Sequence, residues 1–484
     1  MGTRTNLTEN QHVRFSFLSE GQKRLIFNQV LTILQHTGVK VQHNQARALL
    51  EYNGCRIKNE RVYIPSHVVK KALASVPPVT NIYSRSGEVA LRIEQGYTNF
   101  GPGPTCPNFI DPFTFERRKY TRQDAAMVAG LCDALESIGF VMSLGLVSDA
   151  PSGKEGLCEF AEMIQNSGKP PIAWCFSTEH CRAIHQIGVA VAGGPEEFEQ
   201  KPNYLFYNEP ISPLLSDFNA IDKVMYCAEN NIPQIFAPAS TGGGTVPATH
   251  AAHIAVTLAE SIMGVVIAQT INPGACIIIG GTQSILDMRE AVFAYGAPEL
   301  SSLEAGLTEM GEYLGFPVFS AAGCSDSKAM DAQAAIESAL SIHSAMLSGP
   351  NLVHDVGFLE SGMCGSPFQL VLADEIIEKS GFMAKGVLVN EETLARKQIQ
   401  AAGPGGDFRK ITEQRAKKPR SSGDAREEHK GLSEELKNAG RVFSSMPRRI
   451  LDKTRFLVNS RPDPAERIPE EVRARIAQIL EEAE

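Results

Sequence analysis

The sequence predicts an α/β fold of the (β/α)₈ barrel type, with a helical and small β cap at the N-terminus and a C-terminal extension. An apolar run, a polar or glycine-rich ending and a helical stretch follow one another seven times between about residues 138 and 360. Parallel strands that are covered by helices read as continuous apolar runs, and these runs do. A chain of 484 residues can also form a barrel with additions at both ends.

The first part of the chain, residues 1–135, is expected to form a cap packed on the barrel. Residues 20–76 read as three helices with a short extended piece between them, because serine, glycine and proline stand where helices begin and end. Residues 80–120 alternate apolar and polar residues between turn signals, which favours short antiparallel strands. The simplest role for this part is to close the bottom or the side of the barrel.

The barrel itself is expected within residues 136–407. Its strand candidates are the seven apolar runs at 140–147, 170–177, 203–210, 232–241, 276–283, 318–326 and 351–358. The sequence KGVLVN (385–390) is the candidate for the eighth strand. The most hydrophobic stretch, residues 261–281, is interrupted by polar residues and proline. It therefore reads as a helix end, a turn and a buried strand, and not as a membrane span.

The last part, residues 408–484, has a different composition. Residues 413–441 are dense in charge and almost empty of large apolar residues, which is typical of a solvated or disordered segment. A short amphipathic helix, PEEVRARIAQILEEAE, is expected at the end.

Charge and cysteine content narrow the class of protein. The net charge of −9 argues against nucleic acid or an anionic membrane surface as the main partner. The ten cysteines show no CxxC pair and no clustered spacing, so neither a disulfide framework nor a metal site is indicated. The N-terminus lacks the apolar segment of a signal peptide. We therefore expect a soluble, cytoplasmic protein with buried, reduced thiols.

The strand ends carry the main candidate site residues, because barrel enzymes place their chemistry there. His354 follows an apolar run and could exchange a proton or donate to a bound carboxylate; a histidine packed against a carbonyl is the alternative. Its neighbour Asp355 should point to the opposite face of the strand, so the two are not expected to pair. Glu209 follows Tyr207 and Asn208, and either stabilises a cationic substrate or begins an exposed loop.

A glycine turn at Ser240–Thr245 feeds the next predicted helix. Free backbone N–H groups in such a turn suit a phosphate or carboxylate, which makes Thr241 and Gly243 binding candidates. A tight strand-to-helix turn without a ligand is the alternative. No GK[ST] or GxGxxG pattern supports a nucleotide site.

Further candidates follow the sixth run and the aromatic strand ends. Asp326 and Gln333 lie in the polar segment after the sixth run. Lys328 lies between them and could form a Schiff base, although an ordinary exposed lysine is the simpler interpretation. Aromatic residues recur near the strand ends and could hold a quaternary ammonium by cation–π attraction or could only pack the barrel; they are Trp174, Phe176, Tyr207, Phe236 and Phe358.

The chain resembles the trimethylamine methyltransferase family from about residue 15 to residue 407. The resemblance rests on ordered blocks, which are GPGPTCPNFIDPFTFERRKYTRQD, APASTGGGTVP, GGTQSILDMREAVFAYGAPE, GCSDSKAMDAQAAIESAL and NLVHDVGFLESGM. It implies a TIM-barrel enzyme that removes a methyl group from a methylated amine. The implied acceptor is the cobalt of a corrinoid (cobalamin), which a separate corrinoid-binding protein presents over the barrel mouth, as in the methyl transfers of methanogenesis.

The resemblance also implies a substrate class. Founding members contain pyrrolysine, whereas this chain has only standard residues and resembles the relatives that act on quaternary amines such as glycine betaine. The loop 324–328 is the first place to look for the position equivalent to pyrrolysine. Glu209 and aromatic faces would hold the ammonium, and His354 or the turn at Gly242–Gly244 would hold a betaine carboxylate. We expect no permanently bound cofactor and a homo-oligomer.

The family pattern departs soon after GPGGDF. The family usually continues with a tryptophan-bearing segment, but the only tryptophan here is Trp174. A frame-shifted stretch in the coding sequence or a diverged tail would each produce this departure. Two rival functions therefore stay open: a Schiff-base aldolase that uses Lys328, and a betaine-binding relative without catalysis.

Overall fold

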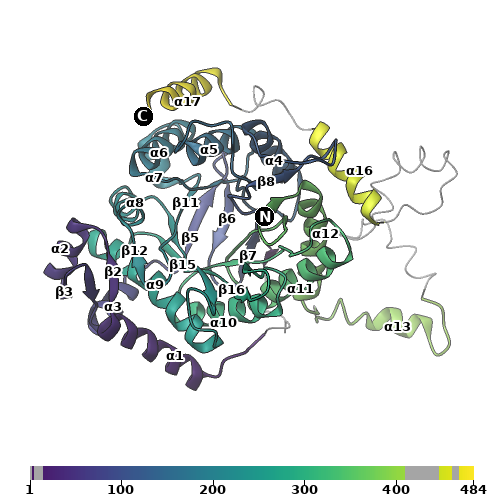
Figure 1. Ribbon diagram of the computed structural model, residues 1–484. Helices are drawn as coiled ribbons and strands as arrows, with labels where there is room; N and C mark the ends of the chain where they lie inside the picture. Colours follow the sequence, from purple (N-terminus) through teal and green to yellow (C-terminus); the bar gives the residue numbers. More distant parts are fainter. Residues whose placement is uncertain (1–2, 5–14, 388, 409–445, 461–467, 484) are drawn as a thin grey trace.

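The computed structural model describes residues 3–4, 15–387, 389–408, 446–460 and 468–483. A ring of parallel strands lies at its centre, and helices surround this ring (Figure 1). Neighbouring parallel strands follow the order β7 (Tyr97–Phe100), β19 (Leu352–His354), β18 (Val318–Ala321), β15 (Ile277–Gly280), β13 (Gln234–Phe236), β11 (Leu205–Asn208) and β10 (Ile172–Ala173).

Residues 138–141 fill the remaining place in the ring. Phe100 of β7 forms a parallel bridge with Ile138, and Val141 forms one with Pro171, just before β10. These bridges join the two ends of the parallel sheet. The ring then has eight strand positions, which confirms the predicted (β/α)₈ barrel.

The eighth strand is not the one that the sequence suggested. It is β7, which lies before the repeated runs and within the region expected to be the cap. No strand occurs at the described residues of 385–390, where Val387 and Val389 are exposed. An apolar run did not identify this strand, because the buried residues of β7 include the polar Thr98 and Asn99. The Asn99 amide donates to the carbonyls of Arg92 and Asn351, which compensates for its burial.

Helices after each strand cover the outside of the barrel. They are α4 (Arg122–Ala134), α5 (Glu155–Asn166), α6 (Thr178–Ala192), α7 (Pro195–Gln200), α8 (Phe218–Glu229), α9 (His250–Ile271), α10 (Pro298–Leu314), α11 (Ala332–Ser348) and α12 (Pro367–Ala384). Among the described residues, only α9 is long and apolar enough to cross a membrane, and 83% of its apolar window is buried inside the molecule. It is a core helix, and the expected helix end, turn and buried strand within 261–281 are confirmed by α9 and β15.

The N-terminal part covers the side of the barrel. Its helices α1 (Glu20–Thr32), α2 (Asn44–Tyr52) and α3 (Ser66–Leu73) share a core with α9. A π-helical turn (Ile33–Thr37) follows α1, and strands β2 (Val39–Val41), β4 (Arg61–Tyr63) and β3 (Arg56–Lys58) form a small sheet with β12 (Leu215–Ser216). This arrangement confirms the three helices predicted for residues 20–76.

A hairpin closes the lower end of the barrel. It consists of β5 (Thr80–Tyr83) and β6 (Val89–Ile93), and its buried Ile82, Leu91 and Ile93 join the core inside the ring. Tyr83, the last residue of β5, donates its amide to the carbonyl of Pro202, ahead of β11, and Arg85 in the turn donates to the carbonyl of Gly168, ahead of β10. The hairpin therefore covers one end of the core inside the ring.

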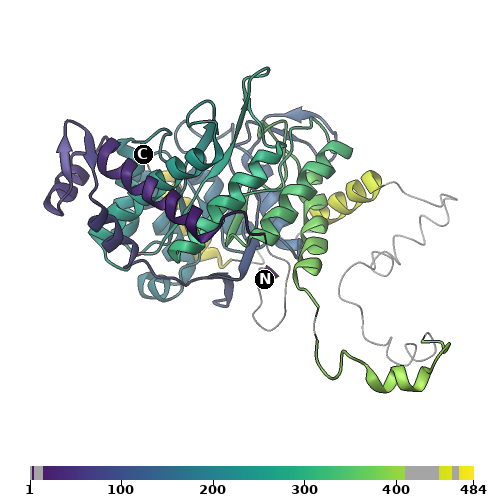
Figure 2. The same cartoon turned by 90° about the horizontal axis from the view of Figure 1, so that it is seen from below.

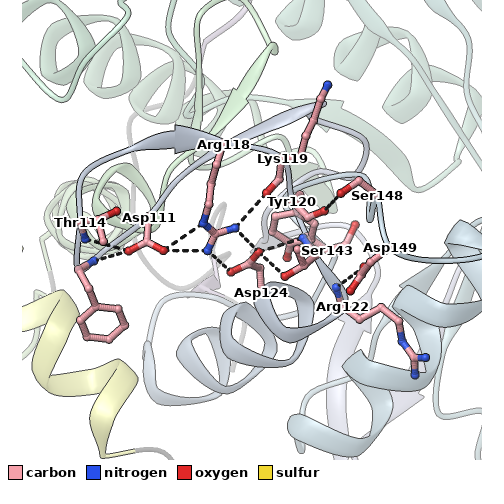
Figure 3. A network of polar contacts seen from close by, with 12 residues as sticks. Asp111, Thr114, Arg118, Lys119, Tyr120, Arg122, Asp124, Ser143, Ser148 and Asp149 are labelled. Carbon is pink, nitrogen blue, oxygen red and sulfur yellow. Dashed lines mark hydrogen bonds and ion pairs between the residues drawn. The ribbon is translucent and has the colours of Figure 1, made fainter.

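Two small sheets stand at the opposite, open end. One contains β8 (Asn108–Ile110), β9 (Arg117–Arg118), β20 (Phe358–Leu359) and β21 (Cys364–Gly365), and we call it the lid sheet. Arg118 bonds both Asp111 and Asp124, and so ties the lid sheet to the start of α4 (Figure 3). The other contains β14 (Ala239–Gly242), β16 (Thr282–Asp287) and β17 (Val292–Phe293), whose hairpin projects beyond the barrel in Figure 2.

Within the described residues, the helices after the barrel are α13 (Arg396–Ala402), α16 (Met446–Asn459) and α17 (Glu470–Glu482). The predicted C-terminal helix is confirmed as α17, which packs on α5 and α6 (Figure 1). The helix α16 was not predicted. It packs on α4 and α12 and buries Ile450, Thr454 and Val458 along one face. The charged stretch 413–441 lies outside the described residues. All ten cysteines are free and nine are buried, as the sequence indicated.

Candidate functional site

The interior of the barrel changes from filled to open along the strands. Its lower part is a closed core of Phe140, Met142, Ile172, Leu205, Ile235, Ala237, Ile278, Phe319 and Leu352, below which the β5–β6 hairpin packs. Residues two positions further along a strand face the same way, so Tyr207, Gly280, Ala321 and His354 come next. Glycine and alanine fill little space, so the polar groups of Tyr207 and His354 lie at the open end.

His354 is the centre of this layer. Its ring stacks on Phe319 with centroids 4.2 Å apart, and lies 6.3 Å from the ring of Tyr207. The Nε2 atom is 3.0 Å from the hydroxyl of Thr282, at the start of β16. The imidazole is buried, with only 4% of its surface exposed. The strand end therefore holds this histidine in one orientation inside the barrel.

His354 and Asp355 do contact each other, contrary to the expectation from strand alternation. The Nδ1 atom of His354 is 2.7 Å from Oδ1 of Asp355. Asp355 has a φ of 68°, so the chain leaves the extended conformation there and alternation no longer applies. The close approach also requires Gly103, since a Cβ at that residue would lie 1.9 Å from the same carboxylate oxygen.

Tyr295 completes the contacts of Asp355. Its hydroxyl donates to Oδ2 at 2.9 Å, and Asp355 itself is 2% exposed. Burial, followed by the charge of Asp355, raises the pKa of Tyr295 well above its usual value. The phenol therefore stays a donor at neutral pH, and the carboxylate remains oriented between Tyr295 and His354.

Glu209 lies at the mouth beside Tyr207. The Tyr207 hydroxyl donates to Oε2 at 3.1 Å, and the amide of Ala239 donates to Oε1 at 3.3 Å. The side chain is accessible to solvent, yet the surrounding protein desolvates it and raises its pKa. Among the described residues, no lysine or arginine forms an ion pair with Glu209. Its negative charge is therefore available to a cation from outside the protein.

The other sequence candidates at the ends of the strands have contacts of their own. Asp326 accepts from the amides of Tyr295 and Gly296, both at 2.9 Å, and from the hydroxyl of Ser361 at 2.7 Å. Its role in the structure is to join loops. Gln333 is exposed on α11 and bonds Glu337.

Other candidates have structural contacts. Asn208 is buried and bonds Gln234 at 3.4 Å. Phe358 is buried and lies edge-on to Tyr295, whereas Phe176 is 51% exposed at the mouth. Lys328 is exposed in a polar loop.

The glycine turn does not offer the free amides on which its predicted anion site depended. The amide of Gly243 donates to the carbonyl of Val246, and those of Gly244, Thr245 and Val246 donate to the carbonyl of Thr241. The Thr241 amide donates to the Thr245 hydroxyl. Gly243 has a φ of 83°, and this left-handed conformation allows the amides of the turn to bond to carbonyls within the same turn. The structure thus supports the alternative, a tight strand-to-helix turn.

Sequence reasoning left Tyr295 out of the site. It contacts Asp355 across 60 positions of the chain, and no local pattern marks that pairing. Within the described part of the chain, no group of three or more His, Cys, Asp or Glu residues is arranged to hold a metal ion. The chemistry that this cluster offers is a carboxylate, aromatic faces and an oriented imidazole.

Comparisons with known proteins agree on one family. The model of the family "Trimethylamine methyltransferase (MTTB)" matches residues 2–416. Trimethylamine methyltransferase MttB of Desulfitobacterium hafniense (strain DSM 10664 / DCB-2) is 27% identical over 472 residues, which cover 96% of this chain and 93% of that protein. This similarity therefore continues past residue 407.

A second sequence relative and one solved structure also match most of the chain. Glycine betaine methyltransferase of Desulfitobacterium hafniense (strain Y51) is 29% identical over 399 residues, or 82% of this chain and 83% of that protein. Among solved structures, the monomethylamine methyltransferase MtmB of Methanosarcina barkeri aligns over 87% of this chain and 93% of its own, with 12% identity and a TM-score of 0.47.

Proposed function

Because the chain belongs to the trimethylamine methyltransferase family, we propose that it moves a methyl group from a small methylated amine to a corrinoid. The relatives named as trimethylamine and glycine betaine methyltransferases support the class of donor. Within that class we propose a quaternary amine of the betaine type. The acceptor that we propose is the reduced cobalt of a corrinoid on a separate protein that docks at the mouth.

The observation that carries this proposal is the carboxylate of Glu209, with which no lysine or arginine of the described residues forms an ion pair. A quaternary ammonium cannot donate a hydrogen bond, because methyl groups cover its nitrogen. It is recognised by negative charge and by aromatic faces instead. Glu209 supplies the charge, and Tyr207 lies between Glu209 and the stacked rings of Phe319 and His354. A neutral or anionic substrate would gain nothing from this arrangement.

A betaine also carries a carboxylate, for which His354 is the partner that we propose. The Nδ1 atom of His354 lies 2.7 Å from Oδ1 of Asp355, and its Nε2 atom lies 3.0 Å from the hydroxyl of Thr282. An imidazole N–H can donate to a carboxylate, and Nε2 is the ring nitrogen that is not in contact with Asp355. Glu209 and His354 would then bind the two ends of one zwitterion.

The proposed reaction does not require the protein to donate a proton to the leaving amine. The new carbon–cobalt bond takes its electron pair from reduced cobalt, while the pair of the broken carbon–nitrogen bond leaves with the tertiary amine. The nitrogen loses its positive charge in this step, so no acid is required. The protein's residues must hold one methyl group toward the mouth and exclude water. We propose no catalytic role for Asp326, whose contacts are to loops.

The rival enzyme class finds no support in the structure. A Schiff-base lysine works in a desolvated pocket, which shifts its pKa toward neutrality. Lys328 is exposed and lies beyond the strand in a loop. Borohydride in the presence of a carbonyl substrate should leave this lysine unmodified; trapping at Lys328 would favour an aldolase.

Methylation of reduced cobalamin by a panel of amines tests the proposal. Glycine betaine, proline betaine, carnitine and trimethylamine would be supplied separately, with loss of the reduced-cobalt absorbance as the readout. We expect turnover with at least one quaternary amine. Binding without methyl transfer, even with a cognate corrinoid protein added, would indicate the non-catalytic relative. Homo-oligomerisation stays a prediction.

A further inference from the structure

Trp174 occupies an unusual place at the rim of the barrel. It is the only tryptophan of the chain and follows β10 directly. The register of β10 and β11 pairs Ala173 with Phe206, so the next residues along, Trp174 and Tyr207, stand side by side on adjacent strands. Tyr207 is the residue that donates to Glu209. The tryptophan is therefore on the strand next to the carboxylate of the proposed ammonium site.

The polar edge of the indole is anchored. Its Nε1–H donates to Oε2 of Glu159, a fully buried side chain of α5, at 2.8 Å. The same carboxylate accepts from the hydroxyl of Ser143 at 2.8 Å and from the amide of Val147 at 3.0 Å. Three donors thus satisfy the carboxylate and fix its position, and a fixed acceptor in turn restrains the ring of Trp174.

This anchor is part of a larger network. The carbonyl of Ser143 accepts from the hydroxyl of Tyr120, which is fully buried and belongs to the polar contacts drawn in Figure 3. Residues 120–124 lead from the lid sheet into α4, and their contacts include the pair Arg118–Asp124. The indole is therefore held by the same framework that holds the lid sheet.

The apolar faces at this rim are left accessible. Trp174 is half-buried, and Phe176, 51% exposed, meets it edge-on with ring centroids 5.1 Å apart. Phe140 and Phe206 of the neighbouring strands, by contrast, have no exposed surface. An anchored edge and a ring that is only half-buried suit a residue that contacts a ligand better than one that only fills a core.

We propose that Trp174 supplies an aromatic face to the quaternary ammonium of the substrate, and that Glu159 is the positioning residue that holds this face in place. The inference rests on the proposed function and extends it to the recognition of the cation. Tryptophan has the aromatic face most favourable to a cation, and its attraction adds to that of Glu209. The pair would favour a quaternary amine over a neutral molecule of the same shape.

The single tryptophan makes the proposal directly measurable. Its fluorescence reports on this residue alone, while calorimetry reports binding independently. The probes are glycine betaine and 3,3-dimethylbutanoate, which has the same shape with carbon in place of the charged nitrogen. We expect glycine betaine to change the emission with the midpoint that calorimetry gives, and to bind more tightly than 3,3-dimethylbutanoate, which lacks the ammonium charge.

Substitutions separate the face from its anchor. Trp174→Leu should weaken glycine betaine binding about 5- to 30-fold while changing the affinity for 3,3-dimethylbutanoate little. Trp174→Phe, which keeps a ring, should retain more of the affinity. Glu159→Leu should weaken glycine betaine binding and shift the emission maximum of Trp174. Glu159→Gln keeps an acceptor for the indole N–H, so it should retain the affinity and the emission maximum of the unaltered chain. Phe382→Leu, an exposed aromatic at the end of α12, is the matched control and should bind normally.

The possible failures are distinguishable. If glycine betaine binds by calorimetry with unchanged tryptophan emission and with equal affinity in Trp174→Leu, the role of Trp174 is overturned while the proposed function stands. An equal loss of affinity for both probes in Trp174→Leu would show a merely structural role, and would overturn it as well. If the unaltered chain binds no methylated amine at all, the proposed function fails, and the inference fails with it.

Discussion

Replacing Glu209 with glutamine should weaken the binding of quaternary amines without disturbing the barrel. The change removes one negative charge but keeps an acceptor for the Tyr207 hydroxyl. Methyl groups keep the ammonium nitrogen about 5 Å from a carboxylate, where the attraction is about 1 kcal/mol in water and about 3 kcal/mol at the effective dielectric of a protein surface. Part of the Glu209 side chain contacts solvent, while the surrounding protein removes much of its hydration. We therefore expect a loss of binding free energy between these limits, which is about 5- to 150-fold in Kd.

Calorimetric titration with tetramethylammonium is the assay, since this probe carries only the charged group. Glu179→Gln, on the exposed side of α6, is the matched control and should leave the Kd unchanged. Desolvation raises the pKa of Glu209, so the affinity of the unaltered chain should fall as the pH is lowered toward that pKa, and Glu209→Gln should lose this dependence. Equal affinity of the variant and the unaltered chain at every pH would refute the reasoning.

Three further outcomes follow from the same contacts. His354→Gln should weaken glycine betaine more than tetramethylammonium, because only the betaine has a carboxylate; calorimetry with both ligands checks this, and equal losses would contradict it. Burial raises the pKa of Glu304 to about 8, so the folded state holds a proton that the unfolded state releases. As the pH rises from about 6 to about 9, the free energy of unfolding should fall by about 2 to 3 kcal/mol because Glu304 loses its proton in the folded state. Denaturant titrations of Glu304→Gln should lack this decrease. Arg455→Ala removes hydrogen bonds to the carbonyls of Pro112 and Phe113, so amide exchange should rise in residues 108–118; unchanged exchange there would show that α16 does not support the lid sheet.

The barrel strands could be predicted from the sequence where their buried residues are apolar. Seven strand positions of the barrel were apparent as apolar runs, because both faces of a parallel strand are covered. The strand β7 was not, since its burial is carried by Thr98 and Asn99 with side-chain hydrogen bonds to the backbone. Val387 and Val389 show the converse, as an apolar pattern that is exposed in the structure.

The site was predictable only in part. Position at a strand end was enough to select Glu209 and His354. The contact of His354 with Asp355 depends on a φ of 68° at Asp355, and backbone conformation at a non-glycine residue leaves no mark in the sequence. Tyr295 is brought in by a loop 60 residues away. The glycine turn misled, because glycine permits both a ligand-binding turn and one whose amides bond internally.

The central claim is methyl transfer from a quaternary amine to cobalt, and an isotope label tests it most directly. Glycine betaine with labelled methyl groups would be incubated with the chain and reduced cobalamin, or a cognate corrinoid protein, and both products analysed by mass spectrometry. We predict labelled methylcobalamin and dimethylglycine in equal amounts, with the rate reduced in Glu209→Gln. Dimethylglycine without methylated cobalt, or no demethylation of any quaternary amine in the presence of reduced corrinoid, would contradict the account.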